Sequence, residues 1–172
     1  NVLNDKELEK LKGKSQNYKA FIQGKFQESS YPTHEKLILK KGAQVMFIKN
    51  DSNPEKRYYN GKIGTIIALD KKEIRVFCKG DLEDIIVTPE TWDNVSYTLD
   101  PKTKEISENS IGSFSQMPLR LAWAITIHKS QGLTFDKAII DANAAFAHGQ
   151  TYVPLSRCRT LEGIVLKNKI AT

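Results

Sequence analysis

The sequence predicts an α/β fold that is interrupted by a small antiparallel β-barrel. Two changes in residue pattern indicate this arrangement. Over residues 51–117, short apolar segments alternate with close turn signals such as Lys79-Gly80-Asp81, which is typical of antiparallel strands in a small barrel. From Pro118 onward, the order strand, helix, strand favours a parallel sheet with helices. We therefore expect three segments, which are residues 1–50, 51–117 and 118–172.

The first segment is expected to contain a short helix and then strands. Residues 4–12 predict the helix, because Leu8 and Leu11 lie three residues apart on one face. Residues 17–27 mix aromatic and polar side chains as strands do. Residues 45–48 are a continuous apolar run, which predicts a strand buried on both faces.

The remaining segments predict further strands in a regular order. The strands expected in the barrel are residues 63–69, 74–78, 84–87 and 95–99. After Pro118, the apolar residues Leu119, Leu121 and Trp123 alternate with other residues and predict another strand. The elements expected after that are a turn into a short helix at 125–132, a buried strand at 137–141, a helix or turn at 149–160 and a final strand at 163–166.

Composition excludes several classes of protein. The chain has 172 residues, a formal net charge of +6 and 40% hydrophobic residues, which is enough to build a core. No apolar run reaches the roughly 18 residues that span a bilayer, and the charged N-terminus lacks the apolar stretch of a signal peptide. Two cysteines form no disulfide framework and favour a reducing compartment. Because there is no starting Met, we expect an excised piece of a longer protein.

Charge is unevenly distributed along the chain. Residues 1–50 contain 10 basic and 5 acidic side chains, residues 51–123 contain 10 and 12, and residues 124–172 contain 6 and 3. Basic ends around a mildly acidic middle indicate that the ends face a polyanion. An ordinary solvated surface explains the same counts, and charge alone favours that simpler interpretation.

One short motif resembles a phosphate-binding P-loop without completing it. A P-loop ending at Gly13-Lys14-Ser15 needs a glycine where Leu8 stands, and it needs a buried strand rather than a helix ahead of it. Gly61-Lys62-Ile63 fails as well, because isoleucine supplies no hydroxyl for Mg²⁺. The chain therefore contains no nucleotide cradle of its own.

Polar side chains gather in residues 124–132, directly after an expected strand. The stretch holds hydroxyls, an imidazole, an ammonium and an amide, all of which donate hydrogen bonds to phosphate oxygens. In α/β folds, ligands bind outside the carboxyl ends of strands. The alternative is a polar helix start on which His128 and Lys129 are merely solvated.

A second cluster lies in YVPLSRCR, residues 152–159. Arg157 and Arg159 stand beside an apolar stretch just before an expected strand, and Arg157 suits bidentate recognition of a phosphate. Two surface arginines are the alternative, which composition alone favours. No metal site is predicted, because the histidines His34, His128 and His148 are scattered and the cysteines lack metal-ligand spacing.

Together these segments resemble superfamily-one DNA helicases of the RecD-like and Pif-type 5′-to-3′ group. ITIHKSQGLTFDKAIID resembles helicase motif V, and GQTYVPLSRCRTLEGIVL resembles motif VI. LKKGAQVMFIKND followed by NGKIGTI resembles the end of a RecA-like strand that enters an inserted barrel. The resemblance covers most of the chain. It implies an incomplete second RecA-like lobe of a P-loop NTPase, interrupted by a Src-homology-3-like barrel.

The resemblance also implies a role for each matching residue. Arg157 would be the catalytic arginine finger that reaches the γ-phosphate of ATP. The residues near the nucleotide would be Gln131, Gly132, Thr134 and Arg157, and those near the backbone of single-stranded DNA would be Thr126, His128, Lys129 and Ser130. In the barrel, Lys62, Arg75 and Lys79 would track the strand. Pro154 departs from the family pattern, in which a small helix-forming residue is common at this position. A proline can kink the segment that presents Arg157.

The implied function is the C-terminal motor-lobe part of an ATP-dependent helicase that moves 5′-to-3′ and unwinds DNA. ATP and Mg²⁺ would be bound mainly by the first RecA-like lobe, so this part alone should not hydrolyse ATP. Expected partners are single-stranded and forked DNA, ATP and the first lobe of the same polypeptide, with no membrane, a monomeric state and a location in the bacterial cytosol or nucleoid. The resemblance links the chain to DNA repair, recombination and telomere maintenance without identifying the pathway. A non-catalytic nucleic-acid-binding module and a protein-docking barrel are the alternatives.

Overall fold

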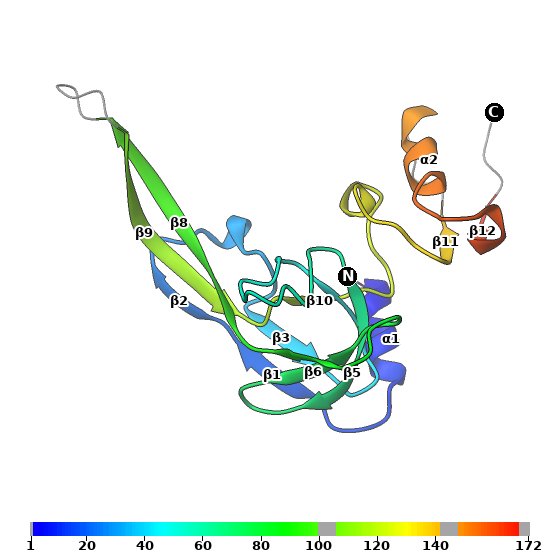
Figure 1. Cartoon of the computed structure of the whole chain (residues 1–172), viewed down its shortest axis with the longest axis horizontal. Helices are drawn as coiled ribbons and strands as arrows, with labels where there is room; N and C mark the ends of the chain where they lie inside the picture. Colours follow the sequence, from blue (N-terminus) through cyan, green and yellow to red (C-terminus); the bar gives the residue numbers. More distant parts are fainter. Residues whose placement is uncertain (1, 100–105, 142–147, 169–172) are drawn as a thin grey trace. The chain divides into compact units, whose positions relative to one another are not determined.

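The computed structural model describes residues 2–99, 106–141 and 148–168 (Figure 1). The chain forms two compact units, Asn1–Trp123 and Ala124–Thr172, which we call unit 1 and unit 2. Among the described residues, no helix is long and apolar enough to cross a membrane.

Unit 1 is built mainly from antiparallel sheets. Its helical elements are α1 (Val2–Lys10) and the short η1 (Glu28–Ser30), and its strands are β1 (Gln16–Lys19), β2 (Phe21–Gly24), β3 (Lys36–Leu39), β4 (Gln44–Phe47), β5 (Ile63–Leu69), β6 (Ile74–Phe77), β7 (Ile85–Val87), β8 (Glu90–Leu99), β9 (Ile106–Gln116) and β10 (Leu119–Leu121). One sheet pairs β1 with β3, a second has the order β10-β4-β5-β6-β7, and a third has the order β2-β9-β8. The helix predicted ahead of Gly13 is confirmed as α1.

Three of the strands expected in the barrel, β5, β6 and β7, lie in the five-stranded sheet, whereas the strand expected at 95–99 is part of β8 in the β2-β9-β8 sheet. In β6, Ile74 and Val76 are buried whereas Arg75 and Phe77 are exposed, because successive side chains of a strand point to opposite faces. Within the described strands, no ladder joins β7 to β10. The sheet is therefore open at these two edges and does not close into a barrel.

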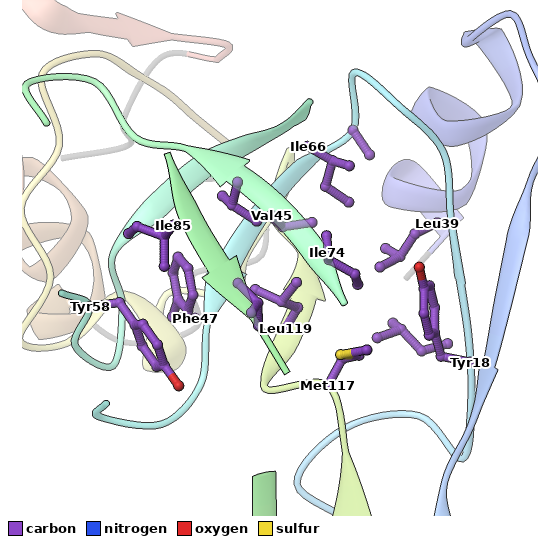
Figure 2. Packing of buried hydrophobic residues seen from close by; sticks show 14 of the residues in the cluster. Tyr18, Leu39, Val45, Phe47, Tyr58, Ile66, Ile74, Ile85, Met117 and Leu119 are labelled. Atoms are coloured by element: carbon purple, nitrogen blue, oxygen red, sulfur yellow. The ribbon is translucent and has the colours of Figure 1, made fainter. Parts of the chain in front are cut away.

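One core of apolar side chains holds unit 1 together (Figure 2). Val45, Ile74 and Leu119 have no exposed surface, although they come from three different strands. The ring of Tyr58 stacks on Phe47 with 4.3 Å between the ring centroids. Burial of this apolar surface is the main favourable contribution to folding.

The domain boundaries expected after residues 50 and 117 do not coincide with the division into compact units. β4 pairs with β5 on one side and with β10 on the other, so all three expected segments contribute to one sheet. The division lies after Trp123 instead. The apolar run in β4 is buried as predicted, because Val45 and Phe47 are 0% exposed and Met46 is 6% exposed.

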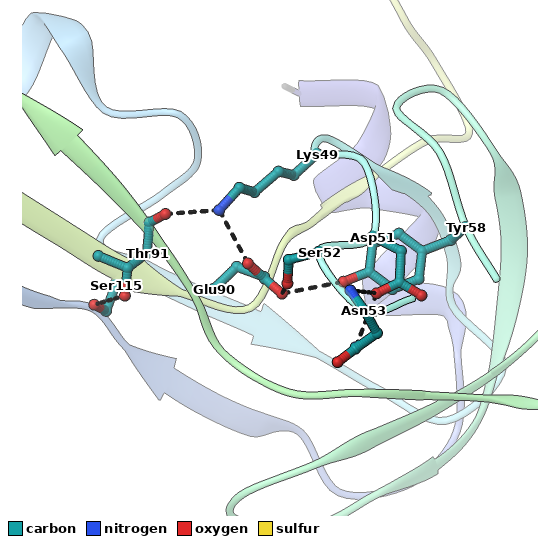
Figure 3. A network of polar contacts seen from close by, with 8 residues as sticks. All are labelled: Lys49, Asp51, Ser52, Asn53, Tyr58, Glu90, Thr91 and Ser115. Carbon is teal, nitrogen blue, oxygen red and sulfur yellow. Dashed lines mark hydrogen bonds and ion pairs between the residues drawn. The ribbon is translucent and has the colours of Figure 1, made fainter. Parts of the chain in front are cut away.

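A polar network joins the segment after β4 to the start of β8 (Figure 3). The Lys49 ammonium donates to Glu90 Oε2 at 2.9 Å and to the Thr91 carbonyl at 2.7 Å, and the Ser52 hydroxyl donates to Glu90 Oε1 at 2.8 Å. The same ammonium lies 5.2 Å from the centroid of the Trp92 ring. These contacts anchor the base of the hairpin that β8 forms with β9.

The loop after β4 is itself ordered by a buried carboxylate. Asp51, which is 5% exposed, accepts backbone N–H groups from Asn53 at 2.9 Å and from Arg57 at 3.0 Å. Desolvation of Asp51 raises its pKa, but these hydrogen bonds outweigh that effect and the net pKa is lowered. The carboxylate form therefore stabilises the loop.

Unit 2 contains the strand, helix, strand order that the sequence predicts. Its elements are η2 (His128–Ser130), β11 (Ala138–Ile140), α2 (His148–Leu155), η3 (Leu161–Gly163) and β12 (Ile164–Leu166). β11 and β12 pair in parallel, with Ile139 opposite Val165. The predicted burial of β11 is only partly correct, since Ile140 is 5% exposed and Ile139 is 75% exposed. Among the described residues, one face of this strand is covered and the other is open.

Candidate functional site

The polar segment 126–134 forms a tight turn that is closed from inside by Ser130. The Ser130 N–H donates to the carbonyls of Thr126 and Ile127, at 3.1 Å each. Its hydroxyl donates to the Ile127 carbonyl at 2.6 Å, and the residue is 5% exposed. Ser130 thus has a structural contact that the sequence did not predict, and it is buried, unlike the other expected DNA-contacting residues.

Those other residues lie at the surface of the same turn. Thr126, His128 and Lys129 are all exposed. The Thr126 hydroxyl oxygen accepts the Lys129 N–H at 3.4 Å, which is a long and weak hydrogen bond. The turn therefore presents a hydroxyl, an imidazole and an ammonium to solvent.

The residues expected near the nucleotide continue this turn toward β11. Gln131 N–H donates to the His128 carbonyl at 3.3 Å, and Leu133 N–H donates to the Ser130 carbonyl at 3.1 Å. Gly132 has φ of 79°, in the left-handed region that favours glycine. Gln131, Gly132 and Thr134 are all exposed.

Arg157 lies two residues after the end of α2, in a turn that Pro154 and Ser156 shape. The Arg157 N–H donates to the Pro154 carbonyl at 3.2 Å, so the proline lies in the last turn of the helix and still accepts a hydrogen bond. The guanidinium donates from Nε at 3.3 Å and from Nη2 at 3.0 Å to the Ser156 hydroxyl oxygen. That hydroxyl in turn donates to the Val153 carbonyl at 3.0 Å. The arginine side chain is half-buried and held against its own turn.

The structure brings these two segments together through backbone hydrogen bonds. Phe135 N–H donates to the Arg157 carbonyl at 2.8 Å, and Arg159 N–H donates to the Phe135 carbonyl at 3.0 Å. This parallel bridge, Phe135 with Cys158, is extended by an exposed ion pair between Arg159 and Asp136 at 3.4 Å. We call these five residues the motif junction. Phe135, which directly follows the turn 126–134, thereby contacts Arg157 through the backbone.

The cations suggested for the inserted sheet have partners inside unit 1. Lys62 Nζ pairs with Asp81 at 2.6 Å, and Arg75 Nε pairs with Asp84 at 2.9 Å. Lys79 also interacts within the chain. The structure thus gives Lys62 and Arg75 intramolecular contacts that their positions in the sequence did not reveal.

Comparisons with known proteins indicate the family of this chain. No protein-family model matches the chain. An ATP-dependent DNA helicase Pif1 of a Psychrobacter species is 33% identical over 214 residues, a match covering 96% of this chain and 32% of that protein. Unliganded Pif1 from a Bacteroides species has a TM-score of 0.88 and 47% identity, over 99% of this chain and 38% of that one. Bacteroides Pif1 in complex with ADP-AlF3 and ssDNA has a TM-score of 0.78 and 48% identity, with the same coverage.

The chain belongs to the Pif1 helicase family. It spans about a third of the length of the relatives it matches. The resemblance seen in the sequence is thereby confirmed, and the fold is that of Pif1 helicase structures.

Three residues of unit 2, namely Phe135, Asp136 and Gly163, shape the candidate site although the sequence did not single them out. Phe135 provides the bridge to Arg157, and Asp136 lies next to it. A Cβ atom on Gly163 would lie 2.1 Å from the Asp136 carbonyl oxygen, so the chain passes Asp136 at a distance that only glycine allows. The only signal in the sequence is a glycine at the start of an expected strand, and that signal does not show which backbone it approaches.

Proposed function

We propose that this chain is a motor-lobe part of an ATP-dependent DNA helicase, namely a second RecA-like lobe with an inserted antiparallel sheet. The observation that supports this proposal most is the 48% identity, over 99% of the chain, to Bacteroides Pif1 in complex with ADP-AlF3 and ssDNA. ATP hydrolysis and DNA unwinding are then activities of the whole protein. A first RecA-like lobe of the same polypeptide supplies the P-loop and most contacts to ATP and Mg²⁺. Among the described residues, no group of three or more His, Cys, Asp or Glu side chains could hold a metal ion.

In this proposal Arg157 is the arginine finger. Its guanidinium donates to a neutral hydroxyl, that of Ser156, and a phosphate oxygen is a stronger acceptor because the hydrogen bond becomes charge-assisted. At the γ-phosphate the guanidinium would neutralise charge that develops during transfer. Gln131, Gly132 and Thr134 would lie near the nucleotide, and the Phe135 bridge keeps their turn beside Arg157.

The exposed side chains of Thr126, His128 and Lys129 would contact the backbone of single-stranded DNA. Hydrogen bonds to phosphates position a protein without reading sequence, which suits a motor that moves along any strand. Ser130 would support this contact from inside the turn. The proposal includes 5′-to-3′ movement, forked DNA as a substrate, and a monomeric protein in the cytosol.

Comparing the whole protein with the 172-residue chain tests this function. We expect the whole protein to hydrolyse ATP, to be stimulated by single-stranded DNA, and to unwind a forked duplex with a 5′ tail in preference to one with a 3′ tail. The 172-residue chain should bind single-stranded DNA without hydrolysing ATP. A whole protein that binds DNA but hydrolyses no ATP would support a non-catalytic nucleic-acid-binding module instead. ATP hydrolysis by the chain alone would also contradict the proposal.

A further inference from the structure

A shallow groove of about 210 Å³ lies in unit 1, and none of the residues assigned above lines it. Its walls come from β1, the start of β2, the turn after β5 and the end of β9. The lining residues that matter here are Lys19, Phe21, Lys71, Ser115 and Gln116. The groove is smaller than a typical pocket for a whole organic ligand, so it suits one unit of a chain-like ligand.

Two lysines line this groove, and the carboxylate of Asp70 lies close enough to add to the effect of burial in raising the pKa of Tyr18 in its floor. Lys19 and Lys71 are exposed, and neither ammonium forms an ion pair or hydrogen bond with the described residues. Lys19 also stands directly opposite Lys36 in the β1–β3 ladder. Like charges directly opposite in a ladder are destabilising, and a bound anion relieves that repulsion. Lys62 and Arg75, in contrast, are already paired with carboxylates.

An exposed aromatic ring stands beside the lysines. Phe21 is 61% exposed at a position opposite Ser115, which is a small partner that leaves the ring face uncovered. A large apolar side chain at the edge of a groove offers a surface on which a flat base can stack.

The polar groups in the floor of the groove are already hydrogen-bonded within the chain. The Gln116 amide donates to the Tyr18 carbonyl at 2.9 Å and to the Glu35 carbonyl at 3.1 Å, and its oxygen accepts the Met117 N–H at 2.9 Å. The Tyr18 hydroxyl donates to the Asp70 carbonyl at 2.6 Å. The floor therefore has few groups left to read the edge of a base, and a ligand would be held by its charge and its flat face.

We propose that this groove is a subsite for single-stranded nucleic acid, with phosphates near Lys19 and Lys71 and a base on Phe21. Cations combined with a stacking ring are the features of sequence-tolerant binding to single strands. An acidic peptide would use the lysines without needing the ring. The proposal rests on the proposed function only for the class of ligand, because the groove is lined by residues of unit 1 and by none from the turn 126–134 or the Arg157 segment.

Fluorescence anisotropy of a labelled oligothymidylate of about 12 nucleotides, titrated with the 172-residue chain, tests the subsite. Phe21→Ala should weaken binding by at least about fivefold, from the loss of one stacked base. Lys19→Ala and Lys71→Ala should each reduce the slope of log affinity against log salt by about 0.7, from the loss of one phosphate contact. The matched controls are Lys72→Ala, which changes charge in the same turn as Lys71, and Phe77→Ala, which removes an exposed ring elsewhere. Both controls should stay near the parent affinity.

The outcomes separate the subsite from the proposed function. If Lys129→Ala weakens binding while the three groove variants match their controls, the subsite is wrong and the motor assignment stands. If polyglutamate displaces the oligonucleotide as well as unlabelled oligothymidylate does, and Phe21→Ala has no effect, the groove binds acidic peptides instead. Absence of binding by a folded parent chain at low salt also overturns the subsite. Thermal unfolding of each variant establishes that it is folded.

Discussion

Replacing Gly163 with alanine tests the packing that holds the motif junction together. The added Cβ atom would lie 2.1 Å from the Asp136 carbonyl oxygen, well inside the 3.0 Å that real Cβ contacts keep. Because the obstructing atom belongs to the backbone, the two segments must separate. Overpacking of this kind costs about 1–3 kcal/mol, and weakening the two hydrogen bonds of Phe135 adds about 1 kcal/mol. We therefore expect a local loss of about 2–4 kcal/mol.

Hydrogen exchange of the Phe135 and Arg159 amides measures this loss directly, because these two N–H groups form the bridge. A loss of 2–4 kcal/mol corresponds to exchange that is roughly 30- to 700-fold faster. Gly132→Ala is the control, since Gly132 has a positive φ but no atom within 4 Å of an added Cβ. That variant should disturb its own turn and leave the bridge protected. Unchanged exchange in Gly163→Ala, or an equal effect in Gly132→Ala, would refute the packing argument.

Three further predictions for unit 1 can be tested by denaturant unfolding. Leu119→Ala should lower the free energy of unfolding by about 2–5 kcal/mol, because Leu119 is fully buried in β10. Leu82→Ala, at a fully exposed position, should change it by less than about 0.5 kcal/mol. Equal effects of the two substitutions would argue against the core described here. A double-mutant cycle of Lys49→Met and Glu90→Gln should give a coupling of about 1–3 kcal/mol because the pair is largely buried, and a coupling near zero would contradict a role in anchoring the hairpin. Asp51→Asn should destabilise the chain by about 1–3 kcal/mol at pH 7, and the difference from the parent should shrink as the pH falls below about 4. The pKa of Asp51 is lowered in the folded state, so the carboxylate stabilises the fold above the unfolded-state pKa near 3.8, and this stabilisation is lost on acidification. A stability difference between Asp51→Asn and the parent that stays constant from pH 7 to pH 3 would contradict this assignment.

Local patterns in the sequence predicted many of the elements, but not β9, whose residues are largely polar. The apolar run at Val45 is a buried strand, and the segment after Pro118 supplies the strand, helix, strand order. The partners of each strand could not be predicted, because pairing between β4 and β10 joins residues more than 70 positions apart. For that reason the expected boundaries after residues 50 and 117 differ from the observed division after Trp123.

The candidate site was predicted by residue type rather than by geometry. A hydroxyl suits a phosphate contact, and the pattern alone could not show that Ser130 uses its hydroxyl to close a turn. In the same way, Lys62 looked like a free cation until the structure placed it 2.6 Å from Asp81. The bridge at Phe135 depends on a close approach that only the fold reveals.

The assignment of Arg157 is tested most directly by ATP turnover of the whole protein carrying Arg157→Ala. We predict that turnover in the presence of single-stranded DNA falls by about 10³-fold or more, while ATP affinity changes by less than about tenfold. Arg159→Ala is the matched control, because its ion pair with Asp136 is exposed and long and should affect turnover little. Turnover at the parent rate in Arg157→Ala would contradict the account.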